Sequence, residues 1–501
     1  MSSVVVVDVG TSNVKVGTVD PSGELLSHAS RELAVERPEK GAAEHDPVAL
    51  FDVLLSLIRE VAGDQDDTIE GLVLSGYHGG FLPLDRDMQP LTGLITLLDT
   101  RTKVVMDQFE REFPMEEIYQ KTGCPSLFIY ALPRLFWLRK EKPDVFTNSR
   151  YFSDVKGYLL YRLAGSFSTE PSVASATQMI NIRENDWDDG ILDMARIGRE
   201  SLPEVVDGDT VVGDLSGKVA RTTGLPEGTP VISGVYDGGS MILGMGGYSG
   251  EVGICNIGTT AMIRTCASEP ILDSVSPPRL QTYSLLPDRW AIGGAVNNAG
   301  ISLKWFRDTL SIGDGYEEII TRARGVGPGA DGVFCLPFLT GERDPRVGNM
   351  ASGVFFGIKD YHTSGHLSRS ILEGVAYSLR MVLESLQDNE IQVDSLRIGG
   401  SGAKSDLWPS IVSDVLNLSV TKSMTPDATL IGSAMVAFTR LGKYSSLAEA
   451  TDAMVRTGKV FEPDEDRQER YMEAYDFFVE LISKLRDMYP SHAAKFLGTE
   501  N

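Results

Sequence analysis

The stretch Val4–Lys15 reads VVVVDVGTSNVK, an apolar run that ends at Asp8 and turns through Gly10, Thr11 and Ser12. A short apolar run bounded by turn residues is typical of a buried strand. Glycine lets the backbone approach a ligand closely, successive backbone N–H groups form an anion-binding nest, and the two hydroxyls add donors. The stretch therefore fits a phosphate-binding hairpin, but also a plain tight connection between two core strands.

The same pattern returns in the second half of the chain, where Cys255 to Thr265 reads CNIGTTAMIRT. Both stretches pass from an apolar strand through a polar residue, an apolar residue, Gly and Thr into another β-rich strand. They stand roughly 250 residues apart, which indicates a duplication at the scale of a domain. Two short turns can also match by chance. If the match is not due to chance, we expect Gly258, Thr259 and Thr260 to form a second phosphate turn that faces the first.

The segments around the two turns predict α/β layers. The first part of the chain reads as three strands, a helix over 47–62 and a buried strand over 69–84. Asp46 suits the N-cap of that helix and Pro47 its first turn. Helices dominate 103–200, and a second set of strands begins near Thr229. No GxxxxGK[ST] motif is present in the sequence, so a P-loop protein is not supported.

Length and composition limit the kinds of partner. A chain of 501 residues predicts about two to four domains, and the net charge of −24 opposes binding to nucleic acid. No apolar run approaches the ~20 residues of a membrane span, and the N-terminal run is read as a strand and not as a signal peptide. Four scattered cysteines are typical of a reduced, cytoplasmic protein. An anionic ligand would need local N–H groups, cations or a metal, and Asp8 is placed to hold Mg²⁺ through water.

The segment GVFFGIKDYHTSGHLSRSILEG, from Gly353 to Gly374, resembles the C-terminal signature of the FGGY carbohydrate kinases, in the actin-like ATPase superfamily. The resemblance covers essentially the whole chain, through PLTGLIT, FCLPFLTGERDP, RIGGSGAKSDLW and GSAMVAF. The earlier signature, at YALPRLFWLRKE, matches only partly, because Arg134 stands where Lys is usual and Ala131 where Ser, Thr or Pro is usual. The resemblance implies two duplicated actin-like (ribonuclease H-like) domains, 1–245 and 246–501, flanking a nucleotide cleft.

The resemblance also implies ATP and Mg²⁺ as cofactors and a role for each matching residue. Asp8 lies near Mg²⁺, and Asp237 in SGVYDGG is the catalytic base. The nucleotide-binding residues it implies are Gly10, Thr11, Ser12, Lys15, Gly258, Thr259, Thr260, Gly399, Gly400, Ser401, Gly402 and Ala403. Each has a structural alternative: Asp237 could cap the helix that follows it, and the loop at 399–403 could be a plain strand–helix connection.

Tyr77 and His78, in GYHGGF, are candidate substrate residues. Xylulose and gluconate kinases have a Met-His pair here, but counting back from Asp85 places Gly79 at that His and His78 at the Met. Glycerol kinases have an Arg-Glu pair at these two places. The chain matches neither pattern, so the departure leaves the identity of the sugar open.

Asp99, Arg101 and Asn297 complete the substrate candidates, together with Asp237. The family commonly has a D-x-R near its substrate, although such a pair is otherwise more often a solvated surface element, and its usual Trp is replaced by Leu97. Asn297, in VNNAG, offers amide donors and acceptors for sugar hydroxyls, or simply forms a turn.

These features predict an ATP- and Mg²⁺-dependent kinase, in the branch of the xylulose and gluconate kinases, that phosphorylates a hydroxyl of a small sugar. A ketose such as D-xylulose is favoured because no basic cluster for a carboxylate is evident in the sequence. Gluconate or a polyol is the alternative, and so is a non-catalytic actin-like sugar sensor, which would not need the base Asp237. We expect a cytoplasmic homodimer whose only partner is the small molecule.

Overall fold

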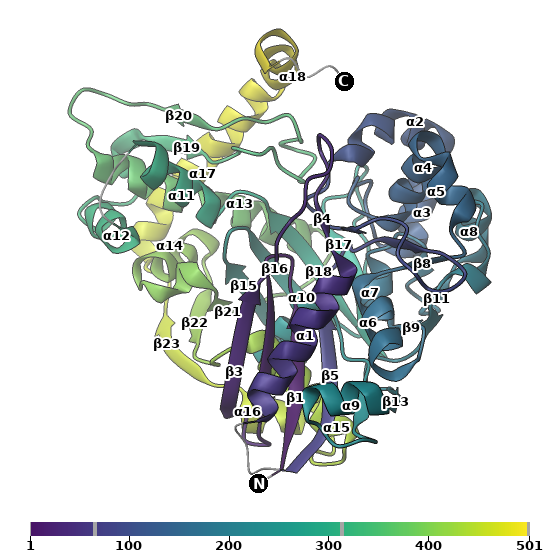
Figure 1. Ribbon diagram of the computed structural model, residues 1–501. Helices are drawn as coiled ribbons and strands as arrows, with labels where there is room; N and C mark the ends of the chain where they lie inside the picture. The colour runs from purple at the N-terminus through teal and green to yellow at the C-terminus, as the bar shows by residue number, and fades with distance from the viewer. Residues whose placement is uncertain (1, 64–67, 311–314, 498–501) are drawn as a thin grey trace.

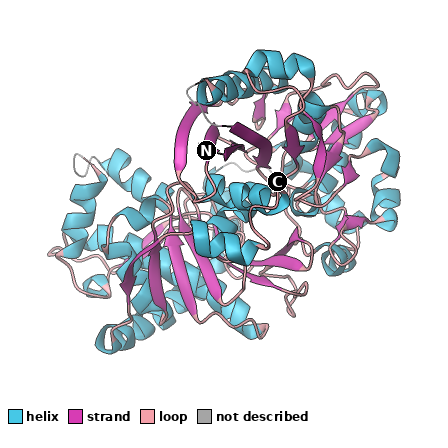
Figure 2. Cartoon of the chain, turned by 90° about the horizontal axis from the view of Figure 1, so that it is seen from below, coloured by secondary structure: helices cyan, strands magenta, loops and turns pink. Residues whose placement is uncertain are grey.

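The computed structural model of the chain describes residues 2–63, 68–310 and 315–497. Two large mixed sheets, each flanked by helices, form its framework (Figure 2). The first sheet has the order β13–β14–β5–β1–β2–β3, formed by Val211–Asp214, Pro230–Ile232, Thr68–Gly76, Ser2–Val9, Asn13–Val19 and Leu25–Glu32. The second has the order β17–β18–β16–β15–β21–β22–β23, formed by Gln281–Leu286, Arg289–Val296, Ala261–Ala267, Val252–Ile257, Ser395–Gly399, Ser419–Ser423 and Thr457–Phe461.

The two sheets repeat one pairing scheme. Strand β1 pairs antiparallel with β2 and parallel with β5, as β15 does with β16 and β21. On one side of each sheet, β3 pairs antiparallel with β2, and β18 pairs antiparallel with β16. On the other side, β14 pairs parallel with β5, and β22 pairs parallel with β21. The edge strands β13 and β23 are both antiparallel. The duplication predicted from the two Gly–Thr turns is therefore confirmed, with β17 as an addition to the second sheet.

Helices cover both sheets as their sequence patterns predict. Helix α1 (Pro47–Ala62) begins at Asp46, whose carboxylate accepts from the N–H groups of Val48 and Ala49 at 2.8 and 3.1 Å. Its apolar face lies in one hydrophobic cluster with β1 and β2 of the first sheet. The helices of the 103–200 region gather on one side of the molecule, to the right in Figure 1. No helix of the described ranges is both long and apolar enough to span a membrane.

Two equivalent helices cross between the sheets. Those that follow β14 and β22 are α10 (Asp237–Gly244) and α15 (Ala428–Arg440). Ile431 of α15 belongs to the same hydrophobic cluster as Val6 of the first sheet, whereas Ile242 of α10 clusters with Ile254 of the second. Each helix therefore packs on the sheet of the other half. The predicted boundary at 245/246 falls between α10 and β15, and the division into two domains there stays a prediction.

The backbones of α10 and α15 touch where the helices cross. A Cβ atom on Gly432 would overlap the carbonyl oxygen of Ser240, and one on Gly244 would overlap that of Ala428. The Ser433 hydroxyl donates to the Ser240 hydroxyl across the contact at 2.8 Å. Only glycine permits such an approach, and the crossing positions the residues at the start of each helix against the opposite sheet.

Candidate active site

Three carboxylates and a lysine meet where β1 ends. Lys15 lies opposite Asp8 across the β1–β2 ladder, and its Nζ is 3.8 Å from Asp8 Oδ2 and 2.9 Å from Oδ2 of Asp427, the residue before α15. Asp8 is 5% exposed, and its Oδ1 is buried without a hydrogen-bond partner in the described part of the chain. Burial and then the negative charge of Asp237 raise the pKa of Asp8 to about 7, although Lys15 opposes the shift.

Asp237 lies at the start of α10, directly after β14 and next to this group. The cap position of the helix is Tyr236 and not Asp237, so the alternative in which Asp237 serves as the N-cap is wrong. Its Oδ1 accepts from the adjacent N–H of Gly238 at 2.7 Å, and no side chain of the described residues hydrogen-bonds to the carboxylate. Burial raises the pKa of Asp237 to about 6, while the Gly238 N–H and Lys15 oppose the shift. The carboxylate is therefore mostly ionised at neutral pH and able to accept a proton.

The second Gly–Thr turn is fastened to the helix that follows β18. Gly258 N–H closes the turn on Thr260 O at 2.8 Å. The first N–H groups of α11 (Gly300–Leu310) donate to the carbonyls of Gly258 and Thr259 at 2.9 and 3.1 Å. The two threonine side chains stay exposed. The exposed hydroxyls of Thr259 and Thr260 would suit a phosphate site.

The glycine-rich loop at 399–403 lies against this second turn. It connects β21 to α14 (Leu407–Leu416). Gly400 has a φ of +84°, and a Cβ there would lie 2.5 Å from the carbonyl oxygen of Ile257, the residue before the turn. The structure therefore brings together the two elements that the sequence assigns to the nucleotide, and glycine is required at their contact.

A metal ion has one suitable protein ligand here. Among the residues that the structure describes, no group of three or more His, Cys, Asp or Glu side chains is arranged to hold a metal. The buried, unpartnered Oδ1 of Asp8 nevertheless fits a Mg²⁺ ion that keeps most of its waters and takes its other ligands from phosphate.

The Tyr77 side chain is linked through His45 to the first Gly–Thr turn. Tyr77 is 1% exposed, and its hydroxyl lies 3.3 Å from Nδ1 of His45. Nε2 of His45 lies 3.1 Å from the carbonyl oxygen of Thr11. Since a carbonyl only accepts, Nε2 carries the proton and Nδ1 accepts from Tyr77. His45 was not predicted from the sequence, where it is only the residue before Asp46, the N-cap of α1.

His78 lies between aromatic rings contributed by both halves of the chain. Its Nε2 donates to Ser172 O at 2.7 Å, so Nδ1 is the unprotonated nitrogen, and among the described residues nothing hydrogen-bonds to it. Its ring stacks on Tyr236 at 3.9 Å and meets Tyr283 edge-on at 4.8 Å. Burial lowers the pKa of His78 to about 3. A neutral imidazole with one free acceptor can bind a sugar hydroxyl.

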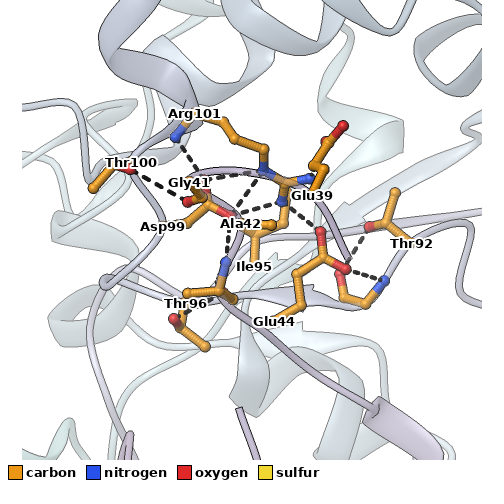
Figure 3. A network of polar contacts seen from close by, with 12 residues as sticks. Glu39, Gly41, Ala42, Glu44, Thr92, Ile95, Thr96, Asp99, Thr100 and Arg101 are labelled. Atoms are coloured by element: carbon orange, nitrogen blue, oxygen red, sulfur yellow. Dashed lines mark hydrogen bonds and ion pairs between the residues drawn. The ribbon is translucent and has the colours of Figure 1, made fainter. Parts of the chain in front are cut away.

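Asp99 and Arg101 form a buried ion pair and not a solvated surface pair (Figure 3). Asp99 is 1% exposed, and its Oδ2 accepts from Ala43 N–H and from Arg101 Nε, both at 2.9 Å. The guanidinium of Arg101 also contacts the carboxylates of Glu39 and Glu44. The pair therefore fixes the 39–44 segment against the segment that follows β7 (Leu94–Ile95).

A second arginine, Arg134, contacts the same region. It is fully buried and donates to the carbonyl oxygens of Gly79 and Thr96. Burial lowers its pKa to about 10. Arg134 thus joins the loop after β5, which carries His78, to the segment that leads to Asp99. The only sequence signal for this role was its departure from the family signature.

Asn297 is tied to the GERDP segment. Its N–H donates to the Glu342 carboxylate at 3.0 Å, and its side-chain oxygen accepts from Arg343 Nε at 2.7 Å. Its side-chain nitrogen donates to Gly341 O at 3.3 Å. Burial raises the pKa of Glu342 to about 7. The structure therefore engages the Asn297 amide within the protein and does not leave it free.

The fold and these turns define an α/β protein of the actin-like, ribonuclease H-like ATPase class. The FGGY carbohydrate kinase N-terminal domain matches residues 3–244, and the C-terminal domain matches residues 253–441. The chain belongs to the FGGY family of carbohydrate kinases, whose members use ATP as phosphate donor and act on small-molecule sugars.

Named relatives match along nearly the whole chain. A xylulose kinase of Bacillus subtilis is 27% identical over 491 residues, 97% of this chain and 98% of its own length. A gluconokinase of the same organism is 27% identical over 496 residues, 96% of each chain. The crystal structure of a ligand-bound xylulose kinase from Lactobacillus acidophilus aligns with a TM-score of 0.93 and 25% identity, over 98% of this chain and 100% of that one.

Proposed function

We propose that the protein transfers the γ-phosphate of ATP to a hydroxyl of a small sugar, with Asp237 as the base. The observation that carries this proposal is the place of Asp237, whose carboxylate has no side-chain partner in the described structure and lies beside Asp8 and Lys15. A group with a pKa near 6 is suited to accept a proton at neutral pH. A sensor that only binds nucleotide would have no need of it.

In the proposed reaction the sugar hydroxyl gives its proton to Asp237 as its oxygen bonds to the γ-phosphorus. The bond from that phosphorus to the β–γ bridging oxygen breaks, and ADP leaves. Lys15 and the N–H groups of the turns at 10–12 and 258–260 bind phosphate, and the loop at 399–403 binds the adenosine. Mg²⁺, held at Asp8, would neutralise phosphate charge. Closure of the two halves would exclude water from the transfer.

On the sugar side, we assign the direct contact to His78, whose Nδ1 accepts a hydroxyl hydrogen bond. Tyr77, Asp99, Arg101 and Asn297 act mainly by positioning, since each is engaged within the protein. The relatives are named for a ketose and for a sugar acid at equal identity. Both D-xylulose and D-gluconate are therefore candidate substrates, with a polyol as a weaker one.

The Asp237→Asn variant tests the proposal. It keeps the shape of the side chain but cannot accept the proton, so we expect kcat to fall about 100- to 10,000-fold while ADP binds as before. ADP release would be measured with each sugar, and ADP affinity by calorimetry. Near-native turnover in the variant would show that Asp237 is not the base. If no sugar stimulates the wild-type protein, the sensor replaces the kinase.

A further inference from the structure

Arg264, on β16, is a buried cation without an anionic partner. It is 5% exposed, and no carboxylate of the described residues forms an ion pair with it. Its guanidinium donates to the side-chain oxygen of Gln281 at 2.9 Å and reaches the Gln281 carbonyl at 3.5 Å. A guanidinium has five N–H donors, and buried arginines are normally paired with an anion. The Nε of Arg264 makes no hydrogen bond to a described residue and is not fully buried, so it is open to a ligand.

The backbone is shaped to hold this guanidinium in place. Gly293 of β18 is the ladder partner of Arg264, and Gln281 of β17 is in turn the partner of Gly293. A Cβ on Gly293 would lie 3.0 Å from Arg264 Cγ and would also overlap the Ile263 carbonyl oxygen. The missing side chain lets Arg264 cross over β18 to Gln281. The sheet therefore fixes the position of the Arg264 side chain.

The guanidinium lies beside the sugar site. Its central carbon is 4.8 Å from the centre of the Tyr283 ring, and that ring meets His78 edge-on at 4.8 Å. Tyr236, which stacks on His78 and directly precedes Asp237, is 4% exposed, and its hydroxyl has no hydrogen-bond partner in the described part of the chain. The positive charge of Arg264 also favours lower pKa values for His78 and Tyr236.

We propose that Arg264 and the Tyr236 hydroxyl bind a carboxylate of the substrate, so that the substrate is a sugar acid of the aldonate class. This inference rests on the proposed kinase function. The hydroxyls of a ketose or polyol can hydrogen-bond to both groups, but they carry no charge and would leave the buried guanidinium without a counter-charge. An anion entering a protein of net charge −24, next to Asp8 and Asp237, needs a fixed cation, and Arg264 supplies one.

The expected ketose preference rested on the lack of a basic cluster in the sequence. A single arginine in CNIGTTAMIRT gave no such signal, because the glycine and tyrosines that surround Arg264 come from other segments. The fold thus places the positive charge of Arg264 near His78, which the sequence pattern alone did not indicate.

The test compares ADP release by the full-length protein with D-gluconate, D-glucitol and D-xylulose. D-glucitol differs from D-gluconate only in having a CH₂OH group in place of the carboxylate. The wild type should prefer D-gluconate, and Arg264→Met should raise its KM about 30- to 1,000-fold while the low activity on D-glucitol changes less than about 3-fold. Arg289→Met is the matched control, because Arg289 lies in the same sheet and stacks on Tyr248 at 5.0 Å. It should leave the preference unchanged.

Tyr236→Phe keeps the test decisive if Arg264→Met folds poorly. It removes only a hydroxyl without a protein partner, so the fold should be as stable as before, and the KM for D-gluconate should rise about 3- to 10-fold. A wild type that prefers D-xylulose overturns the inference but not the kinase. Equal losses on D-gluconate and D-glucitol would show that Arg264 and Tyr236 are structural. Transfer to none of the sugars would refute the proposed function, and the inference with it.

Discussion

The two halves of the molecule have equivalent strand pairs at their Gly–Thr turns, but only the first pair is charged. Asp8 and Lys15 face each other across β1 and β2, whereas the equivalent ladder pair of β15 and β16 is Asn256 with Met262. The backbone scheme is the same in both. The comparison shows that the duplicated scaffold supplies two Gly–Thr turns, while only the first has a charged ladder pair beside it.

The residues that begin the two crossing helices differ in the same way. Asp237 at the start of α10 has no side-chain partner in the described structure. Asp427, the N-cap residue of α15, accepts from Leu430 N–H at 3.2 Å and pairs with Lys15. The two carboxylates thus differ in their contacts: among the described residues Asp237 has no side-chain partner, and Asp427 is bound to a helix N–H and to a lysine.

The largest effect is expected when Asp8, beside the first turn, is replaced by asparagine, the residue found at the equivalent position beside the second turn, Asn256. Asp8→Asn removes the carboxylate that we propose holds Mg²⁺, so kcat should fall about 100- to 1,000-fold. The same change removes a buried charge whose Oδ1 has no partner, so the free energy of unfolding without ligands should rise by about 1–2 kcal/mol. Steady-state kinetics and denaturant unfolding measure the two effects. A variant that is inactive but less stable would show that Asp8 holds the fold together.

The helix crossing can be broken at one glycine. In Gly432→Ala the new methyl group would meet the Ser240 carbonyl, so the free energy of unfolding should fall by about 3 kcal/mol or more. The control is Gly190→Ala in α8 (Asp189–Ala195), where a Cβ would meet only the side chains of Asp188 and Lys121. It should change stability by less than about 0.5 kcal/mol. Equal stability of both variants in denaturant would contradict direct contact between α10 and α15.

A smaller effect is expected for Asp427→Asn. Asn keeps an oxygen for the helix cap but releases Lys15, which is then freer to bind phosphate. Because this ion pair is partly exposed, the KM for ATP should fall only about 2- to 5-fold. The control is Asp464→Asn, at the N-cap of α17 (Glu465–Arg486), which should not change the KM for ATP. A higher KM would mean that Asp427 positions Lys15 instead of restraining it.

The smallest effect concerns pH. With a pKa of about 3, His78 stays neutral, so its own titration should cause no change in the sugar KM between pH 5 and 9. The unfolded chain binds a proton at this histidine near its ordinary pKa of 6.5. The contribution of His78 to stability is therefore present above pH 6.5 and lost as the pH falls toward 3. His78→Gln should lose less stability than the wild type between pH 7 and 4, and an equal loss would contradict the buried neutral state.

Features of the site that depend on neighbouring residues could be predicted from the sequence. The turns at Gly10 and Gly258, the helix start at Asp46 and the place of Asp237 follow from local patterns, and the repeat of one such pattern indicated the duplication. His45, Arg134 and Arg264 could not be found this way, because their roles depend on partners far along the chain. Nor could the sequence show which polar groups are already engaged, as the Tyr77 hydroxyl is.

The exchange of α10 and α15 between the sheets has a consequence for synthesis of the protein. The apolar face that β1 and β5 present to α15 is complete only when residues 428–440 have been made, almost two hundred residues after β14. At ordinary ribosome speeds this interval is about 10–40 s. During that time Val4 and Val6 of β1 lack their cover, so the nascent first half has to be shielded from aggregation, by a chaperone or by the ribosome itself, until the second half arrives.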